Sequence, residues 1–275
     1  MAIFHYKDVE VKINNSGIMA EFVSINTSTN LEPVYILGKK DSINQTPNGP
    51  LQSTISIDHY LDTSYDPGFN LISILRTGHN TSNYTPETIV VAGITGQGYL
   101  SNYDIRISPN EPIKVSVNYL IYEDVSGNIV NKLPSTKFNI TNSSGIAHGN
   151  TSFVTSTANY ITGKIYDLNY SCNINWVPVY ILGTKFPSQI QFMSAHEVFN
   201  FTREYYSGIQ FSGQSLTGYF NFSDGTIDLY GLGYIRGYND YLIQIPISGA
   251  VINKNDVSVN LGDFVRINTE ANNYF

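Results

Sequence analysis

The feature that most constrains this sequence is a hexapeptide that occurs twice. Residues 33–38 and residues 178–183 both read PVYILG. Apolar β-strand text alone would explain the Val, Tyr, Ile and Leu, but not the identical Pro and Gly that flank them. We therefore interpret the hexapeptides, with Tyr35 and Tyr180 at equivalent positions, as part of an internal repeat. Such a repeat decides the fold and has to be considered first.

A second pair of similar stretches follows in the same order along the chain. Residues 96–103 read GQGYLSNY and residues 231–238 read GLGYIRGY, which matches Tyr99 with Tyr234. Two ordered matches far apart in the sequence predict a tandem duplication.

The segment between the two predicted copies has the composition of a linker. Residues 139–152 read NITNSSGIAHGNTS, which is polar, rich in Asn, Ser and Gly, and without periodicity. We therefore predict one domain over 1–138 and a related domain over 153–275, joined by the linker 139–152.

Alternation of apolar and polar residues predicts a mainly β protein made of two tandem β-sandwich or barrel units. In 112–123, PIKVSVNYLIYE, every second residue is apolar, as in a strand with one buried face. The hexapeptides are predicted to lie in equivalent core strands, and contact with another subunit is the less favoured interpretation.

One α-helix is predicted to flank the first unit, over 66–78, DPGFNLISILRTG. Asp66 is a suitable N-cap, Pro67 suits the first turn and Gly78 can close the helix. The corresponding stretch of the second unit, 204–216, contains internal glycines, so its helix is expected to be short or lost.

Composition excludes several classes of function. The net charge is −7, only 13% of residues are charged, and Tyr occurs 21 times. Such a chain lacks the basic patch that specific binding to nucleic-acid phosphates requires. Interface cores between proteins, by contrast, are enriched in Tyr and depleted in charged residues.

A single cysteine, Cys172, excludes an intrachain disulfide, and we expect neither a signal peptide nor a membrane segment.

No arrangement of residues typical of catalysis or metal binding occurs. The histidines are scattered and form no H-x-x-x-H pair, and no G-x-S-x-G motif is present. We predict no catalytic residue, no cofactor and no metal site, and hence a protein that is not an enzyme. A carboxylate pair for glycoside hydrolysis stays open as an alternative, because its spacing is spatial rather than sequential.

Three stretches together carry a family resemblance. They are LEPVYILG (31–38), TPNGPLQSTISIDHYL (46–61) and GQGYLSNYDIRISPNEPIKVSVNY (96–119). With the adjoining helix, they resemble tailed-bacteriophage virion proteins of the tail-tube type. The similarity covers roughly residues 20–125 and is much weaker over the second copy.

The resemblance implies a β-sandwich whose sheets join neighbouring subunits into a ring around a channel. Such rings normally have six units, so three duplicated chains would give a trimer that is a pseudo-hexameric ring. It further implies assembly in the host cytoplasm, location in the phage tail, contact with other tail proteins, and DNA that passes without specific binding. An acidic chain suits that passage, because a negative channel repels DNA phosphates.

Two loops are candidate contacts between subunits or rings. One contains Lys39, Lys40, Asp41 and Ser42, and the other contains Asn80 and Tyr84. The alternative for both is an ordinary solvated loop.

Other functions stay open at this point. The protein could act in a neck, a baseplate or a tube end rather than in the repeating tube. It could also be a carbohydrate- or receptor-binding β-sandwich, whose exposed aromatic rings would stack on sugars. A glycoside hydrolase ranks third.

Overall fold

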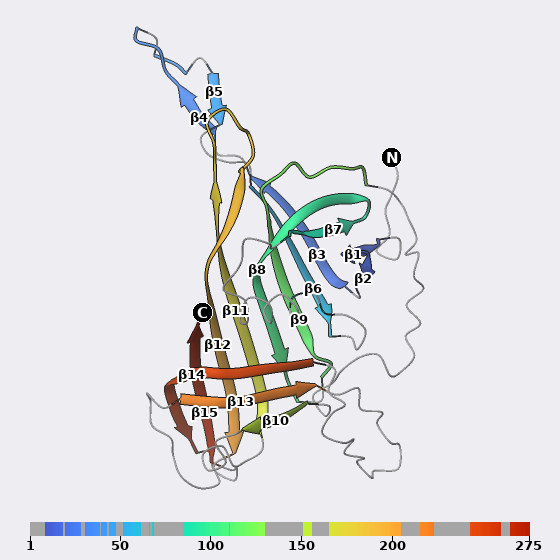
Figure 1. The fold of residues 1–275 in the computed structure, drawn as a ribbon, viewed down its shortest axis with the longest axis vertical. Helices are drawn as coiled ribbons and strands as arrows, with labels where there is room; N and C mark the ends of the chain where they lie inside the picture. The colour runs from blue at the N-terminus through green and yellow to red at the C-terminus, as the bar shows by residue number, and fades with distance from the viewer. Residues whose placement is uncertain are drawn as a thin grey trace.

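The computed structural model is an elongated, mainly β protein in which several long strands run along the long axis and others cross it (Figure 1). It describes residues 9–18, 20–28, 31–38, 40–42, 44–47, 52–61, 66, 68, 85–109, 111–129, 151–155, 165–204, 215–222, 243–259 and 265–275. In this part of the chain, no helix is long and apolar enough to cross a membrane.

Nine strands belong to the first half of the chain: β1 (Val11–Ile13), β2 (Ser16–Gly17), β3 (Ala20–Ser28), β4 (Leu31–Val34), β5 (Asn44–Pro47), β6 (Gln52–Tyr60), β7 (Glu87–Val91), β8 (Ile94–Ile107) and β9 (Lys114–Ile121). Six belong to the second half: β10 (Thr151–Thr155), β11 (Ile165–Val179), β12 (Gln189–Glu204), β13 (Ser215–Phe222), β14 (Ile243–Ser258) and β15 (Arg266–Tyr274).

The two halves have the same strand order. In the first half, neighbouring strands follow the order β1–β7–β8–β9–β6–β3, and in the second half the order β10–β13–β14–β15–β12–β11. Every one of these pairs is antiparallel. Strand β11 also pairs with β8, which joins the halves into a single 13-stranded sheet, while β4 and β5 form a separate ribbon.

A bulge at the same place bends one long strand of each half, β8 and β14. The register shifts directly after Leu100 in β8 and directly after Ile252 in β14. Leu100 pairs with Tyr119 of β9, and Ile252 pairs with Ala271 of β15. Because a bulge kinks its strand, the first part of each strand turns away to pair with β7 or β13, as the curved β8 in Figure 1 shows.

The matched bulges correct one sequence match. They make β14 the structural counterpart of β8, so Tyr99 corresponds to Val251 rather than to Tyr234. Tyr99 lies half-buried in β8, and Tyr234 lies outside the described residues. The glycine-tyrosine similarity of 96–103 and 231–238 therefore does not mark equivalent strands.

Several other predictions can be compared with the fold. The mainly β class is confirmed. The alternation predicted for 112–123 is confirmed in β9 and in Ile113, which directly precedes it. The apolar face is buried: Ile113, Val115, Val117, Tyr119 and Ile121.

The helix predicted over 66–78 falls outside the described residues, apart from Asp66 and Gly68, which are both buried. Strand β10 begins at Thr151, within the predicted linker 139–152. The rest of that linker is not described.

The hexapeptides do not lie in buried strands, so this prediction was wrong. Each is at the tip of a hairpin, where its Tyr follows the last strand residue, Val34 of β4 or Val179 of β11. Their apolar side chains have little to pack against, and Leu37 and Leu182 are fully exposed, at 102% and 101%. An apolar run is buried only where a second layer covers it, and these hairpins extend beyond the sheet (Figure 1).

One hydrophobic cluster runs through both halves. It includes Ile57, Tyr103 and Val117 of the first half and Tyr170 and Phe199 of the second. The two halves are therefore packed against each other, because the β11–β8 junction lies inside this cluster.

Candidate assembly site

The junction between β11 and β8 is a well-packed pairing of two strand edges. Residues 168–173 pair with residues 102–107, and the side chains that point to the core from both strands are buried. The rings of Tyr103 and Tyr170 contact edge to face, with centroids 6.3 Å apart. Such apolar cross-strand pairs are the unit of sheet stability.

Polar contacts also hold this junction. The indole Nε1 of Trp176 donates a buried hydrogen bond of 2.6 Å to the carbonyl oxygen of Leu100. On the opposite face, Asn102 Nδ2 donates to Asn173 Oδ1 at 2.9 Å. Beyond the sheet, Lys185 Nζ, in the connection between β11 and β12, lies 2.7 Å from Asp124 Oδ2 of the first half. Contacts on both faces of the sheet therefore fix the register between β11 and β8.

Among the described residues, the strands that correspond to β11 and β8 in the other half each have an unpaired side, β14 only in its second part. Strand β3 corresponds to β11, and within the described residues it pairs only with β6. Strand β14 corresponds to β8. Beyond Val251, it pairs with β15 on one side, and no described strand pairs with its other side. In the part of the chain that the structure describes, one edge of each kind is therefore unpaired.

Residues at equivalent positions in β3 and β11 differ in burial, because β11 has a neighbouring strand that β3 lacks among the described residues. Counting from the matched hexapeptides, Thr27 of β3 corresponds to Cys172 of β11. Cys172 is fully buried against β8, as expected of a small apolar side chain, whereas Thr27 is exposed.

The same contrast holds for the β8-type edge. Counting from the matched bulges, Val257 corresponds to Ile105 and Val259 to Ile107. Ile105 is 0% exposed and Ile107 2%, whereas Val257 is 49% exposed and Val259 68%. These valines are the apolar side chains that a neighbouring strand would cover.

The face of the continuous sheet that points away from the hydrophobic core is polar and rich in asparagine. We call it the polar face. Asn118 Nδ2 donates to Asn102 Oδ1 at 3.4 Å, and the contact continues to Asn173 across the junction. At the β3 end, Lys114 Nζ lies 2.9 Å from Glu21 Oε2, and its hydrogen bond lowers the pKa of that exposed carboxyl group.

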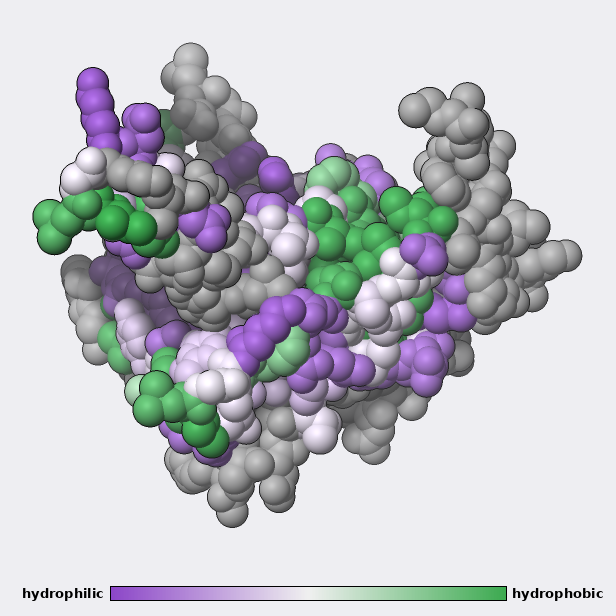
Figure 2. All heavy atoms as spheres, turned by 90° about the horizontal axis from the view of Figure 1, so that it is seen from above, coloured by the Kyte–Doolittle hydropathy of each residue, from purple (hydrophilic) through white to green (hydrophobic). Residues whose placement is uncertain are grey.

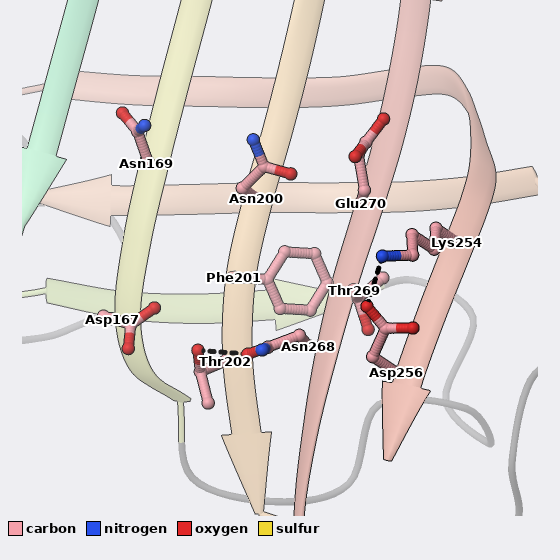
Figure 3. Close-up of a pocket in the computed structure, with 10 residues that line it drawn as sticks. All are labelled: Asp167, Asn169, Asn200, Phe201, Thr202, Lys254, Asp256, Asn268, Thr269 and Glu270. Atoms are coloured by element: carbon pink, nitrogen blue, oxygen red, sulfur yellow. Dashed lines mark hydrogen bonds and ion pairs between the residues drawn. The ribbon is translucent and has the colours of Figure 1, made fainter. Parts of the chain in front are cut away.

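A depression lies on this face where the strands of the second half run side by side (Figure 3). Its lining comes from β11, β12, β15 and β14: Asp167, Asn169, Asn200, Phe201, Thr202, Lys254, Asp256, Asn268, Thr269 and Glu270. Lys254 pairs with Asp256 at 2.5 Å, and Thr202 donates to Asn268 at 2.7 Å. Phe201 is the one aromatic residue of the lining, and its ring is buried on the core side.

The tips of the two hairpins form a further exposed feature. We call residues 35–38 the β4–β5 tip and residues 180–183 the β11–β12 tip. The pairs that close them, Val34 with Asn44 and Val179 with Gln189, enclose connections of equal length. Both tips lie toward the same end of the molecule (Figure 1).

Of the predicted contact residues, Lys40, Asp41 and Ser42 are exposed and follow the β4–β5 tip. Lys40 occupies the position that corresponds to Lys185 in the other hairpin. Lys39, Asn80 and Tyr84 lie outside the described residues. The sequence analysis did not predict the unpaired sides of β3 and β14. Whether an apolar residue such as Val257 is exposed depends on which strand lies beside it, and the local sequence does not contain that information.

The described residues contain no group of three or more His, Cys, Asp or Glu side chains that could hold a metal ion. No protein-family model matches the chain, and no curated protein matches it significantly.

Proposed function

We propose that this chain is a structural protein of a phage tail, in which three copies form a pseudo-hexameric ring around a channel for DNA. The observation that carries the proposal is the pairing of β11 with β8 inside the chain, combined with the open counterparts β3 and β14. The repeated strand order supports an origin by tandem duplication. The resemblance of residues 20–125 to tail-tube proteins supports the phage assignment.

The internal junction gives the register of the proposed contact between chains. Leu168 pairs with Ile107, Tyr170 with Ile105 and Cys172 with Tyr103. Transferred to their counterparts, β3 of one chain would pair with β14 of the next through these residues: Val23 with Val259, Ile25 with Val257, and Thr27 with Asn255.

This register joins side chains of like character. Val23 and Ile25 are half-buried and pack at the margin of the core, and their proposed partners are the exposed valines Val257 and Val259. The contact is heterologous, since different edges meet, and such a contact gives a closed ring when its rotation divides a full turn. Closure would also remove both exposed edges, which are otherwise sites of uncontrolled association.

The ring would leave an open channel. Eight strands of each chain form one continuous order, β3–β6–β9–β8–β11–β12–β15–β14, so three chains would close a barrel of twenty-four strands. Barrels of about sixteen to eighteen strands already contain an aqueous channel. At about 4.8 Å per strand, twenty-four strands have a circumference of at least about 115 Å and a diameter of about 37 Å.

We assign the polar face to the channel. Its asparagines and carboxylates offer hydrogen bonds without the clustered positive charge that would hold DNA phosphates. The opposite face contributes to the hydrophobic core. The depression of Figure 3, with its single buried aromatic ring, lacks the exposed aromatic platform that stacking on sugars requires.

A disulfide pair tests both the ring and its register. In Thr27→Cys/Asn255→Cys, the two cysteines of adjacent chains would face each other at the antiparallel spacing of about 4.5–5.5 Å between Cα atoms, which a disulfide can bridge. After mild oxidation, we expect covalently linked trimers on a non-reducing gel. Light scattering of the wild-type chain should give the mass of three chains, and negative-stain electron microscopy should show rings.

Three controls define the result. Each single cysteine variant should stay unlinked, and buried Cys172 should not react. The pair Thr27→Cys/Val259→Cys, displaced by four residues along β14, should not link. Monomers in light scattering combined with no linked species would contradict the ring, and linkage only through the displaced pair would contradict the register.

A further inference from the structure

We propose that the two hairpin tips insert into the outer layer of a lipid bilayer. In each tip, an isoleucine and a leucine would enter the hydrocarbon, and a lysine that follows the tip would contact the phosphate headgroups. The inference goes beyond the proposed function. It does not depend on the ring, because every chain carries both the β4–β5 tip and the β11–β12 tip.

The apolar side chains of the tips are exposed to an extent that folding does not explain. Ile36 is 50% exposed and Leu37 102%, while Ile181 is 60% exposed and Leu182 101%. Packing within the chain therefore does not select the two leucines. Nevertheless, the tips belong to the stretch that is identical in both halves. Contiguous exposed apolar residues of this kind mark a site that binds a protein or a membrane.

A glycine follows each leucine and shapes its turn. Gly38 has a φ of +90° and Gly183 of +88°, a backbone conformation that favours glycine. In the β11–β12 tip, Thr184 donates hydrogen bonds to the carbonyl oxygen of Ile181 from its backbone N, at 3.1 Å, and from Oγ1, at 2.8 Å. The leucine is therefore presented on a structured turn, and its insertion does not require the hairpin to change its fold.

Polarity changes in the same order along both tips. A tyrosine precedes the apolar pair and a lysine lies three residues after the leucine: Tyr35 and Lys40 at the first tip, Tyr180 and Lys185 at the second. All four side chains are exposed. Tyrosine rings are enriched at the boundary between water and hydrocarbon, and lysine side chains extend to the headgroups. The order therefore matches the gradient from the interior of a bilayer to its surface.

The shape of the tips favours a bilayer over a protein partner. Seen from above this end of the molecule, apolar atoms form narrow projections at the margin of the view (Figure 2). A protein interface has an apolar core inside a polar rim, whereas a fluid bilayer accepts narrow projections without a complementary shape. Both tips lie toward the same end (Figure 1), so one chain can insert both into a single surface. Two linked insertions bind more tightly than either alone.

The charges close to the tips suit anionic lipids, although the chain as a whole is acidic. Lys185 pairs with Asp124 at 2.7 Å, but both side chains are more than half exposed, at 61% and 56%. Such a pair contributes little to stability, so the ammonium group can contact a phosphate as well. The net charge of −7 gives no general attraction to an anionic surface. Binding to anionic vesicles would therefore report the tips.

The test measures binding to vesicles with and without the leucines. Flotation and sedimentation should show the wild-type chain bound to vesicles of phosphatidylcholine, and more tightly to vesicles of equal parts phosphatidylcholine and phosphatidylglycerol. In Leu37→Ser/Leu182→Ser, the affinity for both vesicles should fall at least about tenfold, because the buried apolar area drives insertion. Both leucines are exposed, so circular dichroism and the mass in light scattering should not change.

Two further variants serve as controls. Tyr274 is 70% exposed, but it lies on β15 and stacks on His196, so Tyr274→Ser should bind vesicles like the wild type. Lys40→Ser/Lys185→Ser should bind phosphatidylcholine vesicles like the wild type. On vesicles that contain phosphatidylglycerol, its affinity should fall by up to about fivefold per lysine. Equal binding of this variant to the anionic vesicles would contradict the role of the lysines.

A dye at the tip distinguishes insertion from adsorption at the surface. Buried Cys172 should not react, so Leu182→Cys can be labelled with the environment-sensitive dye NBD. Its fluorescence should rise when vesicles are added and should be quenched by lipids that carry a spin label in the acyl chain. The same dye at Ser258→Cys, an exposed position on β14, should not respond.

The outcomes separate this inference from the proposed function. A wild-type chain without affinity for vesicles, or a double leucine variant that binds as the wild type does, would contradict the insertion and indicate that a protein covers the tips. Binding without quenching of the dye at residue 182 would also overturn it. Chains that form rings but do not bind vesicles would contradict only this inference. Chains that bind vesicles but form no rings would contradict only the proposed function.

Discussion

At the scale of single residues, Glu87 is a buried carboxyl group in the first half. It is 8% exposed, and Asn14 Nδ2 donates to its Oε1 at 3.2 Å. Burial raises the pKa of Glu87, and the nearby carboxylate of Asp66 raises it further. The folded protein therefore holds this proton to a higher pH than the unfolded chain does.

This pKa shift predicts a pH dependence of stability. Between the unfolded pKa, about 4.3, and the raised folded value, the folded state binds more protons, so the free energy of unfolding falls as pH rises. Glu87→Gln keeps the shape of the side chain but cannot ionise, so it should lose this pH-dependent part of the free energy of unfolding. Urea unfolding of both proteins from pH 4.5 to pH 8 should show the variant gaining stability relative to the wild type as pH rises. A constant difference across that range would contradict the assignment.

Glu197 is a second buried carboxyl group, and it has a different environment. It is 0% exposed and accepts hydrogen bonds from Tyr170 Oη at 2.5 Å and from Asn273 Nδ2 at 3.0 Å. These contacts connect β11, β12 and β15 inside the core of the second half.

Removing Glu197 alone should lower the free energy of unfolding more than removing both Glu197 and the hydroxyl of Tyr170. Glu197→Leu leaves the Tyr170 hydroxyl buried without its acceptor, and we expect a loss of about 1–3 kcal/mol in the free energy of unfolding. Adding Tyr170→Phe removes that hydroxyl and should restore part of the loss. Chemical denaturation measures both effects, and a double variant with the sum of two separate losses would show that the groups are not coupled.

At the scale of elements, the edges of β3 and β14 would decide how chains associate. The counterpart of Val257 inside the chain, Ile105, is completely buried by the neighbouring strand. A charge at Val257 would therefore be tolerated in the free chain and become buried in the proposed contact.

Two adjacent lysine substitutions test this edge. Val257→Lys places its charge on the core side of β14, and Ser258→Lys places the same charge on the polar face. An uncompensated buried charge costs about 3–5 kcal/mol, so Val257→Lys should weaken ring formation by at least about a hundredfold, while Ser258→Lys should form rings. Sedimentation equilibrium gives both constants, and equal behaviour of the two variants would argue against pairing at this edge.

At the scale of the whole molecule, the polar face would determine whether the ring binds DNA. Asn169 and Asn200 are exposed on this face and contribute no charge (Figure 3). The rings of the wild-type protein are expected not to retain duplex DNA at physiological salt.

Added positive charge on this face should create DNA binding. In Asn169→Lys/Asn200→Lys, three chains would place six ammonium groups in the channel, and affinity should fall steeply with salt through counterion release. Thr184→Lys/Gln189→Lys adds the same charge near the β11–β12 tip and serves as the control. Fluorescence anisotropy with a short duplex compares them, and equal binding by both variants would place the polar face outside the channel.

Strand periodicity was readable from the sequence because it is local. A strand alternates its side chains between two faces, so the pattern of 112–123 was enough to predict which residues of β9 are buried. The hexapeptide repeat likewise marked two hairpins that the structure builds with the same register.

The sequence by itself thus determined the β class, the alternation within strands and the correspondence of the two hexapeptides. Only the tertiary structure decided that β14 corresponds to β8, that the hexapeptides project as tips, and that β3 and β14 are open edges. The physical reason is that burial is not a property of a segment. Thr27 and Cys172 occupy equivalent positions. Cys172 is buried because β8 lies beside β11 on the side away from β12, whereas no described strand lies beside β3 on the side away from β6.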